Sequence, residues 1–324
     1  MAALRGGIDL GGTKVQAIVA DERHRVVGQA RRPTPTTGGP EDVIAVLADA
    51  QREAAEQAGV ATSELAGVGL GSPGDVDAGA GTVAQAGNLP SWQDAVPVGD
   101  LLGASLGTKV SIGNDVSVAT AAEYEIGAGR PYSSLLGVFW GTGVGGGLIL
   151  DGREWEGRGA AGEIGHMVVR RNGALCPCGR RGCMEAYAGR KAMEAEARRR
   201  HDHGEHTHLF KIMRERGRDR LTSGIWERAL HHGDKLAKDL FDRAYEALGA
   251  GVASAVNLLD VEAVVLGGGL GVRFGDAAAE RLLDAMRPHL FNDDRPPAVA
   301  VASLGDLGGA LGAAMLVPRR SLSS

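Results

Sequence analysis

The stretch Asp9-Leu10-Gly11-Gly12-Thr13-Lys14 is the part of this 324-residue chain that decides its fold. It joins two short apolar runs, Leu4–Leu10 and Val15–Ala20, which predicts a strand, a tight glycine turn and a second strand. Backbone N–H groups in such a turn can face phosphate oxygens, and the threonine and lysine add a hydroxyl and a positive charge. The aspartate at the strand end is suited to hold Mg²⁺ through water. An ordinary hairpin turn has the same pattern, so both interpretations stay open here.

The same arrangement recurs in the second half of the chain. The turn Gly141-Thr142-Gly143 separates the apolar runs Leu135–Trp140 and Val144–Leu150, and glycines 145–147 follow it. A weak internal repeat of this kind indicates two related domains. Two such turns facing each other would hold a polyphosphate from both sides. The chain has no G-x-x-x-x-G-K-[ST] motif, so it is not a P-loop enzyme.

Strands alternate with helices along the rest of the chain, which predicts an α/β fold. We expect one α/β domain from residues 1–117 plus 304–324, and a larger one from residues 118–303 with a cysteine-rich loop and a helical region. The further expected strands are Val26–Ala30, Leu65–Leu70, Val110–Gly113, Val261–Leu266 and Ala298–Ala302. The expected helices are Glu41–Ala58, Val116–Ile126, Asp234–Asn257 and Gly308–Leu316.

Composition and charge exclude several classes of function. A net charge of −5 argues against a general nucleic-acid binder, which would carry a basic face. No apolar run approaches the roughly 18 residues that a membrane span needs. The first residues lack the apolar core of a signal peptide. We therefore expect a cytoplasmic protein that binds neither nucleic acid nor membrane.

The motif Gly113-Asn114-Asp115 follows an expected strand and precedes an expected helix. A carboxylate there can point toward a ligand, and phosphoryl transfer needs one group to orient a hydroxyl and accept its proton. Asparagine and aspartate are also favoured as helix N-caps. The residues alone leave the catalytic base and the cap equally open.

Three cysteines, Cys176, Cys178 and Cys183, lie within eight residues, and His166 stands ten residues before the first of them. Three thiolates and an imidazole make the ligand set of a tetrahedral zinc site. Buried free thiols are the alternative. Four protein ligands leave no position for a catalytic water, so a zinc ion here would be structural.

Together with three further motifs, these features resemble the ROK family of sugar kinases and repressors, within the actin-like ATPase (hexokinase-type) superfamily. The motifs are Gly71-Ser72-Pro73-Gly74, Asn88-Leu89-Pro90-Ser91-Trp92 and Glu163-Ile164-Gly165-His166, and the resemblance runs from Asp9 to about Met315. It implies two ribonuclease-H-like domains with a cleft between them. It also implies structural Zn²⁺ with His166 as fourth ligand, and a homodimer, with a tetramer left open.

The resemblance also implies roles for individual residues. The residues expected to hold the sugar are Asn88, Asn114, Asp115, Glu163, His166 and Glu185, with Asp115 as the catalytic base. Those expected around the phosphates of ATP are Asp9, Gly11, Gly12, Thr13, Lys14, Thr142 and Gly143. Gly267, Gly268 and Gly269 resemble the adenosine-contacting turn, although a plain strand-to-helix turn would have the same residues.

The function implied by this resemblance is Mg²⁺- and ATP-dependent phosphorylation of a hexose at its 6-hydroxyl, with glucose as the leading candidate substrate. Kinases for N-acetylglucosamine, N-acetylmannosamine, fructose or allose are alternatives, because the loops that face the sugar's 2-position are not evident in the sequence. Polyphosphate is a less favoured donor. A sugar-sensing repressor is disfavoured, because the motif at Asp9 starts too early for a preceding DNA-binding domain, and because Thr13 and Asp115 are present.

Overall fold

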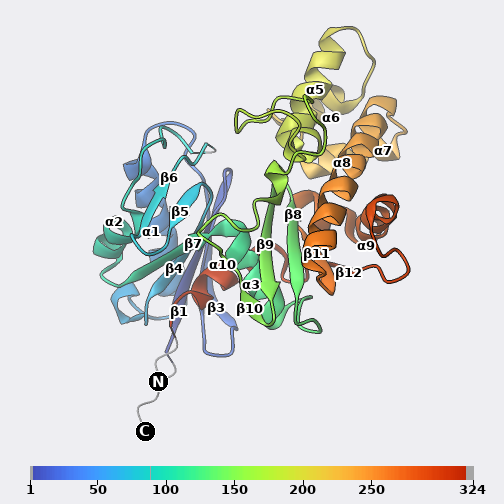
Figure 1. The fold of residues 1–324 in the computed structure, drawn as a ribbon. Coiled ribbons are helices and arrows are strands. Elements are labelled where there is room, and N and C mark those ends of the chain that lie inside the picture. The colour runs from blue at the N-terminus through green and yellow to red at the C-terminus, as the bar shows by residue number, and fades with distance from the viewer. Residues whose placement is uncertain (1–2, 88, 319–324) are drawn as a thin grey trace. The chain divides into compact units, whose positions relative to one another are not determined.

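The computed structural model describes residues 3–87 and 89–318 (Figure 1). The chain divides into two compact units, the first formed by residues 1–127, 154–161 and 303–324, the second by residues 128–153 and 162–302. Helix α3 (Asp115–Ile126) lies wholly in the first unit, whereas the division from sequence places its larger part in the second domain. It lies there because it packs on α10 (Gly308–Met315), where Gly312 is in backbone contact with Val118.

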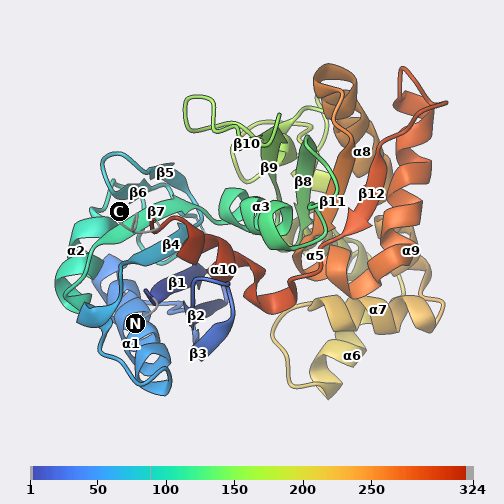
Figure 2. The ribbon, with the colours of Figure 1, turned by 90° about the horizontal axis from the view of Figure 1, so that it is seen from below.

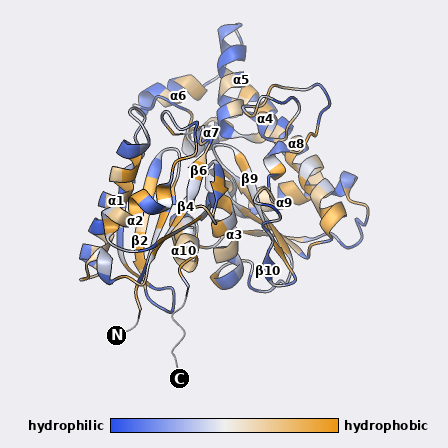
Figure 3. Ribbon diagram, turned by 60° about the vertical axis from the view of Figure 1, so that its left-hand side comes forward, coloured by the Kyte–Doolittle hydropathy of each residue, from blue (hydrophilic) through white to orange (hydrophobic). Residues whose placement is uncertain are grey.

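The first unit is built on a five-stranded sheet of order β3-β2-β1-β4-β7. Strands β1 and β2 form an antiparallel hairpin extended by β3, whereas β4 and β7 run parallel to β1. These strands are β1 (Arg5–Leu10), β2 (Lys14–Ala20), β3 (Val26–Pro33), β4 (Val68–Ser72) and β7 (Val110–Asn114), and a separate hairpin pairs β5 (Asp75–Asp77) with β6 (Thr82–Ala84). Helices α1 (Pro40–Gln57) and α2 (Val98–Leu106) complete the unit with α3 and α10. Apolar and polar residues alternate along α1, as expected of a helix with one buried face (Figure 3).

The two faces of β1 pack against different helices. Ile8 and Leu10 point into the core shared with α1 and α2. Gly7, on the opposite face, lies directly under α10, and a Cβ there would collide with the carbonyl oxygen of Ala310. Gly69 of β4 is in the same position under Ala313. Because these strand residues have no side chain, the backbone of α10 rests on the sheet beside β1 and β4 (Figure 2).

The second unit has a sheet of order β10-β9-β8-β11-β12. Strand β9 is antiparallel to β8, whereas β11 is parallel to β8 and β12 is parallel to β11. These strands are β8 (Leu135–Trp140), β9 (Val144–Leu150), β10 (Arg153–Glu154), β11 (Ala263–Gly267) and β12 (Ala298–Val301). The helices are α4 (Glu185–Ala188), α5 (Arg190–Asp202), α6 (Leu209–Glu215), α7 (Ser223–His231), α8 (Lys235–Leu259) and α9 (Gly268–Met286). Short 3₁₀ segments occupy Thr62–Glu64, Ile164–His166, Arg287–His289 and Gly305–Leu307.

An aromatic cluster forms the core between the second sheet and its helices. The ring of Trp140, at the end of β8, lies 5.5 Å from that of Phe241 and 5.1 Å from that of Tyr245, both on α8. The indole Nε1 of Trp140 donates to the carbonyl oxygen of Ala188 at 2.6 Å. This bond fixes the short helix α4 beside the turn that follows β8. Within the described residues, no helix combines the length and the apolar character that crossing a bilayer requires.

Candidate active site

Polar residues lie at the carboxyl ends of three neighbouring parallel strands in the first unit. The register places Asp9 of β1 opposite Gly71 of β4, and Ser72 of β4 opposite Asn114 of β7. Asp115 comes directly after Asn114. The carboxyl edge of a parallel sheet is where α/β proteins bind ligands. The structure therefore brings Asp9 and the adjacent residues Asn114 and Asp115, which come from two separate motifs, to one sheet edge.

Asn114 is the N-cap of helix α3. Its Oδ1 accepts hydrogen bonds from the backbone N–H of Val116 at 3.0 Å and of Ser117 at 3.2 Å. The cap interpretation is therefore correct for Asn114. Asp115 is the first helical residue, and its Oδ1 also accepts from the N–H of Val116, at 2.9 Å. That bond orients the partly buried carboxylate of Asp115 at the start of the helix.

The first glycine turn closes the hairpin between β1 and β2. The N–H of Gly11 donates to the carbonyl oxygen of Lys14 at 2.9 Å, and the hydroxyl of Thr34 donates to the carbonyl oxygen of Gly11 at 2.6 Å. The hairpin interpretation is therefore correct for the backbone, and a phosphate role for the same turn stays a prediction. Thr34 is a buried residue beside this turn that the sequence does not reveal.

An ion pair from the far end of the chain reaches the same turn. The Nζ of Lys14 lies 3.0 Å from one carboxylate oxygen of Asp306, and Nη1 of Arg31 lies 3.3 Å from the other. Asp306 precedes α10, which the sheet glycines hold against β1. Nothing near Lys14 in the sequence indicates this partner, because only the fold brings the two segments together.

The carboxylate of Asp9 lies against the first turn of α10, where a Cβ on Gly309 would come within 2.8 Å of its Cγ. Burial raises the pKa of Asp9 to about 6, against the lowering effect of the Lys14 charge and with a further rise from Asp306. A carboxylate that is buried in this way favours its neutral form. Asp9 therefore costs folding free energy at neutral pH, which is typical of a residue retained for function.

Replacing Asp9 with asparagine is expected to stabilise the protein at neutral pH. The pKa of about 6 in the folded state lies above the ordinary 3.8, so the ionised carboxylate opposes folding above pH 6. As the pH falls from 6 to 4, the carboxylate of Asp9 takes up its proton in the folded protein before it does so in the unfolded chain. The free-energy cost of burying the charge disappears as a result. Asp9→Asn should raise the free energy of unfolding by roughly 1–3 kcal/mol at pH 8 and by almost nothing at pH 4. Urea unfolding of the ligand-free protein across this range measures both values. The exposed Asp293→Asn is the control, and a less stable Asp9→Asn protein at pH 8 contradicts the prediction.

In the second unit, the two predicted glycine turns are neighbours. Strand β11 pairs with β8, and Gly267 stands opposite Phe139. Gly268 has a φ of +78°, and a Cβ there would lie 2.5 Å from the carbonyl oxygen of Trp140. Residues 267–269 thus pass closely over the end of β8 and continue into α9. The strand-to-helix interpretation of Gly267, Gly268 and Gly269 describes the backbone correctly, and their contact with adenosine stays a prediction.

Glu185 connects the second glycine turn with the cysteine loop. Its Oε2 accepts a hydrogen bond from the N–H of Val144 at 2.9 Å, and its carboxylate packs directly against Gly143. Its Oε1 lies 4.0 Å from the Sγ of Cys176. The position of this predicted sugar ligand therefore depends on both the turn and the loop.

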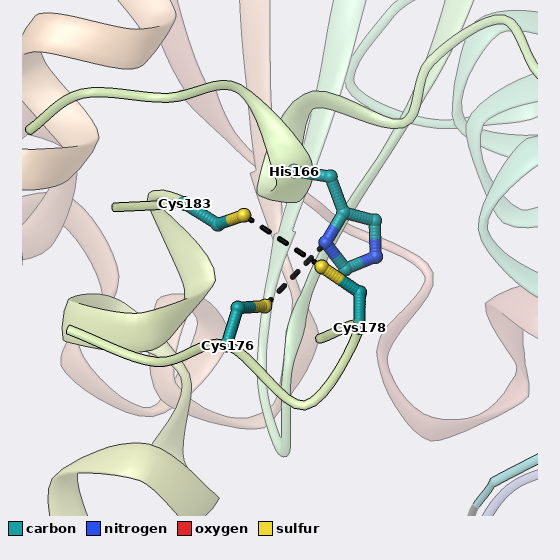
Figure 4. Close-up of side chains that lie close together, drawn as sticks. All are labelled: His166, Cys176, Cys178 and Cys183. Carbon is teal, nitrogen blue, oxygen red and sulfur yellow. Dashed lines mark hydrogen bonds between the residues drawn. The ribbon is translucent and has the colours of Figure 1, made fainter. Parts of the chain in front are cut away.

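The predicted metal ligands converge. The ligand atoms of His166, Cys176, Cys178 and Cys183 all lie within 4.8 Å of one another, with their side chains pointing inward (Figure 4). His166 Nδ1 is 3.7 Å from Cys176 Sγ, and the sulfurs of Cys178 and Cys183 are 3.7 Å apart. A tetrahedron with Zn–S bonds of about 2.3 Å has edges of about 3.8 Å. The four residues therefore fit a zinc ion, and the sulfurs stand well beyond the roughly 2.05 Å of a disulfide.

The thiols of this cluster have unequal acidities. Burial raises the pKa of Cys176 to about 12 and also raises that of Cys183. Burial opposes ionisation of Cys178 as well, but hydrogen bonds from the backbone at Arg180 and from the other two thiols lower its pKa to about 7. A cation that binds three thiolates must displace the remaining protons, so its affinity depends on pH.

The other ring nitrogen of His166 faces the remaining predicted sugar ligand in this unit. Nε2 of His166 lies 3.8 Å from Oε2 of Glu163. The cluster is thus flanked by two carboxylates, Glu163 on the histidine side and Glu185 on the cysteine side. Asn88 lies outside the described residues. Among the described residues, no second group of three or more histidine, cysteine or acidic side chains brings its ligand atoms together. This includes the segment His201–His208, which contains four histidines.

The model of the ROK family matches residues 5–320, and the chain belongs to this family. A glucokinase of Thermotoga maritima is 31% identical over 319 residues, 97% of each chain. An N-acetyl-D-glucosamine kinase of Pectobacterium atrosepticum is 33% identical over 96% of this chain and 97% of its own. Among solved structures, a ROK glucokinase of Streptomyces griseus in complex with glucose and AMPPNP is 32% identical, with a TM-score of 0.83 over 97% of this chain and 99% of that one. The predicted α/β, actin-like fold class is thereby confirmed.

Proposed function

We propose that this chain is an ATP-dependent hexokinase that phosphorylates the 6-hydroxyl of a hexose, with glucose as the first candidate. The observation that carries the proposal is the likeness over nearly the whole chain to a structure solved with glucose and AMPPNP. The carboxylate of Asp115, at the same sheet edge as Asp9, adds support from the chain's own geometry.

Asp115 is the proposed catalytic base. Its carboxylate would orient the 6-hydroxyl and accept its proton as the oxygen attacks the γ-phosphorus. Oδ1 is already engaged by the N–H of Val116, so the carboxylate has a preferred direction before the sugar binds. Asn114, Glu163, His166 and Glu185 are the proposed sugar ligands. Carboxylates that each accept more than one hydroxyl proton suit a polyol.

The two glycine turns are proposed to bind the nucleotide. The phosphates would lie at Asp9, Gly11, Gly12, Thr13 and Lys14 from the first unit and at Thr142 and Gly143 from the second, with adenosine at Gly267–Gly269. Mg²⁺ bound with ATP would neutralise charge on the phosphates, with Asp9 suited to hold its water ligands. The Lys14–Asp306 pair at 3.0 Å would loosen as phosphate oxygens compete for the ammonium group.

Zinc is the proposed occupant of the His166–Cys183 cluster, in a structural role. His166, Cys176, Cys178 and Cys183 would complete its coordination sphere, which leaves no ligand position for substrate. Its effect on the reaction is therefore positional, because the same loop carries Glu163 and ends at Glu185.

The sugar's 2-position decides between glucose and the alternatives. The Pectobacterium relative is named for N-acetyl-D-glucosamine at an identity close to that of the glucokinases. An N-acetylglucosamine kinase is therefore the second candidate. Fructose, N-acetylmannosamine and allose follow, and polyphosphate is the second candidate for the donor.

We also propose a cytoplasmic homodimer, as the family resemblance implies. The second unit exposes two large apolar side chains near the end of α8, Leu258 at 83% and Phe291 at 94%. They belong to one surface, because the N–H of Phe291 donates to Oδ1 of Asn257 at 2.8 Å. Sedimentation equilibrium would distinguish a dimer from a monomer or a tetramer.

A coupled assay of ADP release with ATP·Mg²⁺ tests the proposed function. The panel contains glucose, N-acetylglucosamine, N-acetylmannosamine, fructose and allose, with polyphosphate as a second donor. Turnover greatest on glucose is the expected result. Turnover only on another sugar keeps the chemistry and replaces the substrate, whereas a folded protein inactive with every sugar contradicts the kinase.

A further inference from the structure

Arg190 is a charged residue at the second glycine turn that none of the sequence motifs includes. Its Nη2 donates to the hydroxyl of Thr142 at 3.0 Å, and its Nη1 donates to the carbonyl oxygen of Leu221 at 2.7 Å. The backbone N–H groups of Arg190 and Lys191 donate to Gly141 and Thr142, both at 3.1 Å. The start of helix α5 is therefore fixed to this turn, and the guanidinium group with it.

The charge of Arg190 has no acidic partner at ion-pair distance. Within residues 3–87 and 89–318, no carboxylate oxygen is recorded within 4.0 Å of its nitrogens, and its two side-chain acceptors are neutral oxygens. Burial lowers the pKa of Arg190, the charge of Arg220 lowers it further, and Glu194 only partly compensates. A partly buried cation without a bound anion is costly to keep.

The carboxylate best placed to neutralise Arg190 is engaged elsewhere. Glu194 stands one helical turn further along α5. Its Oε1 accepts from Nη2 of Arg198 at 2.6 Å, and its Oε2 accepts from the N–H of Leu221 at 2.8 Å. The local structure thus keeps the guanidinium group of Arg190 oriented without satisfying its charge. An anionic ligand would supply the missing partner.

The position of Arg190 indicates which anion this is. Thr142, its hydroxyl partner, belongs to the turn proposed to bind phosphate. Leu221, its carbonyl partner, is two residues from Ser223, whose Oγ lies 3.4 Å from where a Cβ on Gly269 would stand. The guanidinium group therefore contacts the proposed phosphate turn and a segment, residues 221–223, that reaches the proposed adenosine turn, all within one unit.

We propose that Arg190 is a further nucleotide-binding residue, whose guanidinium group binds the phosphate chain of ATP from the second unit. This inference rests on the proposed kinase function. Two of its five N–H donors serve Thr142 and Leu221 and orient the planar group. Arginine suits this role because its planar donors match phosphate oxygens and its charge persists on burial.

Isothermal titration of the full-length protein tests the proposal. ATP·Mg²⁺, ADP·Mg²⁺ and adenosine are titrated into the wild type, Arg190→Gln and Arg190→Lys, with adenosine measured by displacement. We expect Arg190→Gln to weaken ATP and ADP about 10- to 100-fold, as for a lost charge-assisted hydrogen bond, and adenosine by less than about threefold. Arg190→Lys should recover part of the ATP affinity, since it keeps the charge.

Two further variants distinguish direct binding of phosphate by Arg190 from a purely structural role in holding the Thr142 turn. Arg199→Gln is the matched control, because it makes the same change on the same helix at a residue that pairs with Glu196 and leaves Glu194 engaged, and it should leave all three affinities unchanged. Thr142→Val removes the hydroxyl that Arg190 holds. If Arg190→Gln weakens adenosine as much as ATP, with Thr142→Val reproducing that loss, Arg190 only braces the turn and the proposal is wrong.

The failure of the inference is distinguishable from failure of the proposed function. A wild type that binds ATP, together with an Arg190→Gln variant of equal affinity, overturns only the role of Arg190. A wild type that does not bind ATP overturns the kinase and this inference with it. Equal melting temperatures of the variants, measured beside each titration, exclude unfolding as the cause of a lost affinity.

Discussion

Replacing Asp115 with asparagine is expected to lower kcat by about 10³-fold while the dissociation constant for the sugar changes less than about tenfold. Asparagine keeps an oxygen that can accept from the N–H of Val116, so the start of α3 is preserved. It cannot take the proton of the attacking hydroxyl, so the loss falls on the chemical step. Asp115→Ala should lose more, because hydroxyl alignment disappears as well.

The neighbouring asparagine supplies the matched control. Asn114→Ala removes the cap that accepts from Val116 and Ser117, which should cost about 1 kcal/mol of stability. Asp115→Asn should leave the unfolding midpoint nearly unchanged. Steady-state kinetics, sugar binding followed by tryptophan fluorescence, and urea unfolding separate the two residues. An Asp115→Asn enzyme that retains a tenth of wild-type kcat would exclude Asp115 as the base.

Local features of the sequence predict the strands around the glycine turns well. Strands β8 and β9 have the predicted bounds, and β2 begins one residue earlier than predicted. Each is an apolar run that ends at a glycine turn, so the signal lies within a few residues. Strand β4 runs on to Ser72, two residues beyond its predicted end, because Gly71 and Ser72 pair with β7. Pairing with a distant strand has no local signal.

Helices rich in glycine are harder to predict. Helix α9 starts at Gly268 and contains Gly275, whose φ of 56° and ψ of −137° interrupt it. The sequence indicates a strand-to-helix turn at Gly267–Gly269 as one alternative but gives no bounds for the helix that follows. Glycine has a low helix propensity, so such a segment forms because tertiary packing holds it. Helix α10 was predicted in spite of its glycines, within one residue of its end.

The candidate site shows the same division between local and distant signals. The metal ligands were predicted because three of the four lie within eight residues, and the structure brings all four together. Arg190 and Asp306 were missed because their partners, Thr142 and Lys14, are far away in the chain. Charge balance at a site is a property of the fold, and spacing in the sequence does not predict it.

Replacing Cys178 with serine is expected to remove bound zinc and to lower kcat/KM for the sugar by about 10²-fold or more. Serine keeps the shape but is a poor ligand for zinc, and lost metal ligands or their supports typically cost large factors in affinity. Without the ion, the two remaining buried thiols, Cys176 and Cys183, are no longer held together, and the loop loses the contacts that hold Glu163 and Glu185. Glu185 also accepts from Val144, so a disordered loop should weaken ATP as well.

Tyr187→Phe is the control for the zinc prediction, because it perturbs the same loop and leaves the ligands intact. The hydroxyl of Tyr187 accepts from the N–H of Ala174 at 2.8 Å, and its loss should cost about 1 kcal/mol without releasing metal. Metal content by plasma mass spectrometry and hydrogen exchange over residues 163–185 are the measurements. Exchange should rise throughout that segment in Cys178→Ser and only near residue 174 in Tyr187→Phe. A Cys178→Ser protein that keeps one equivalent of zinc and full activity would contradict the prediction, because neither the ion nor the activity would then depend on the thiolate of Cys178.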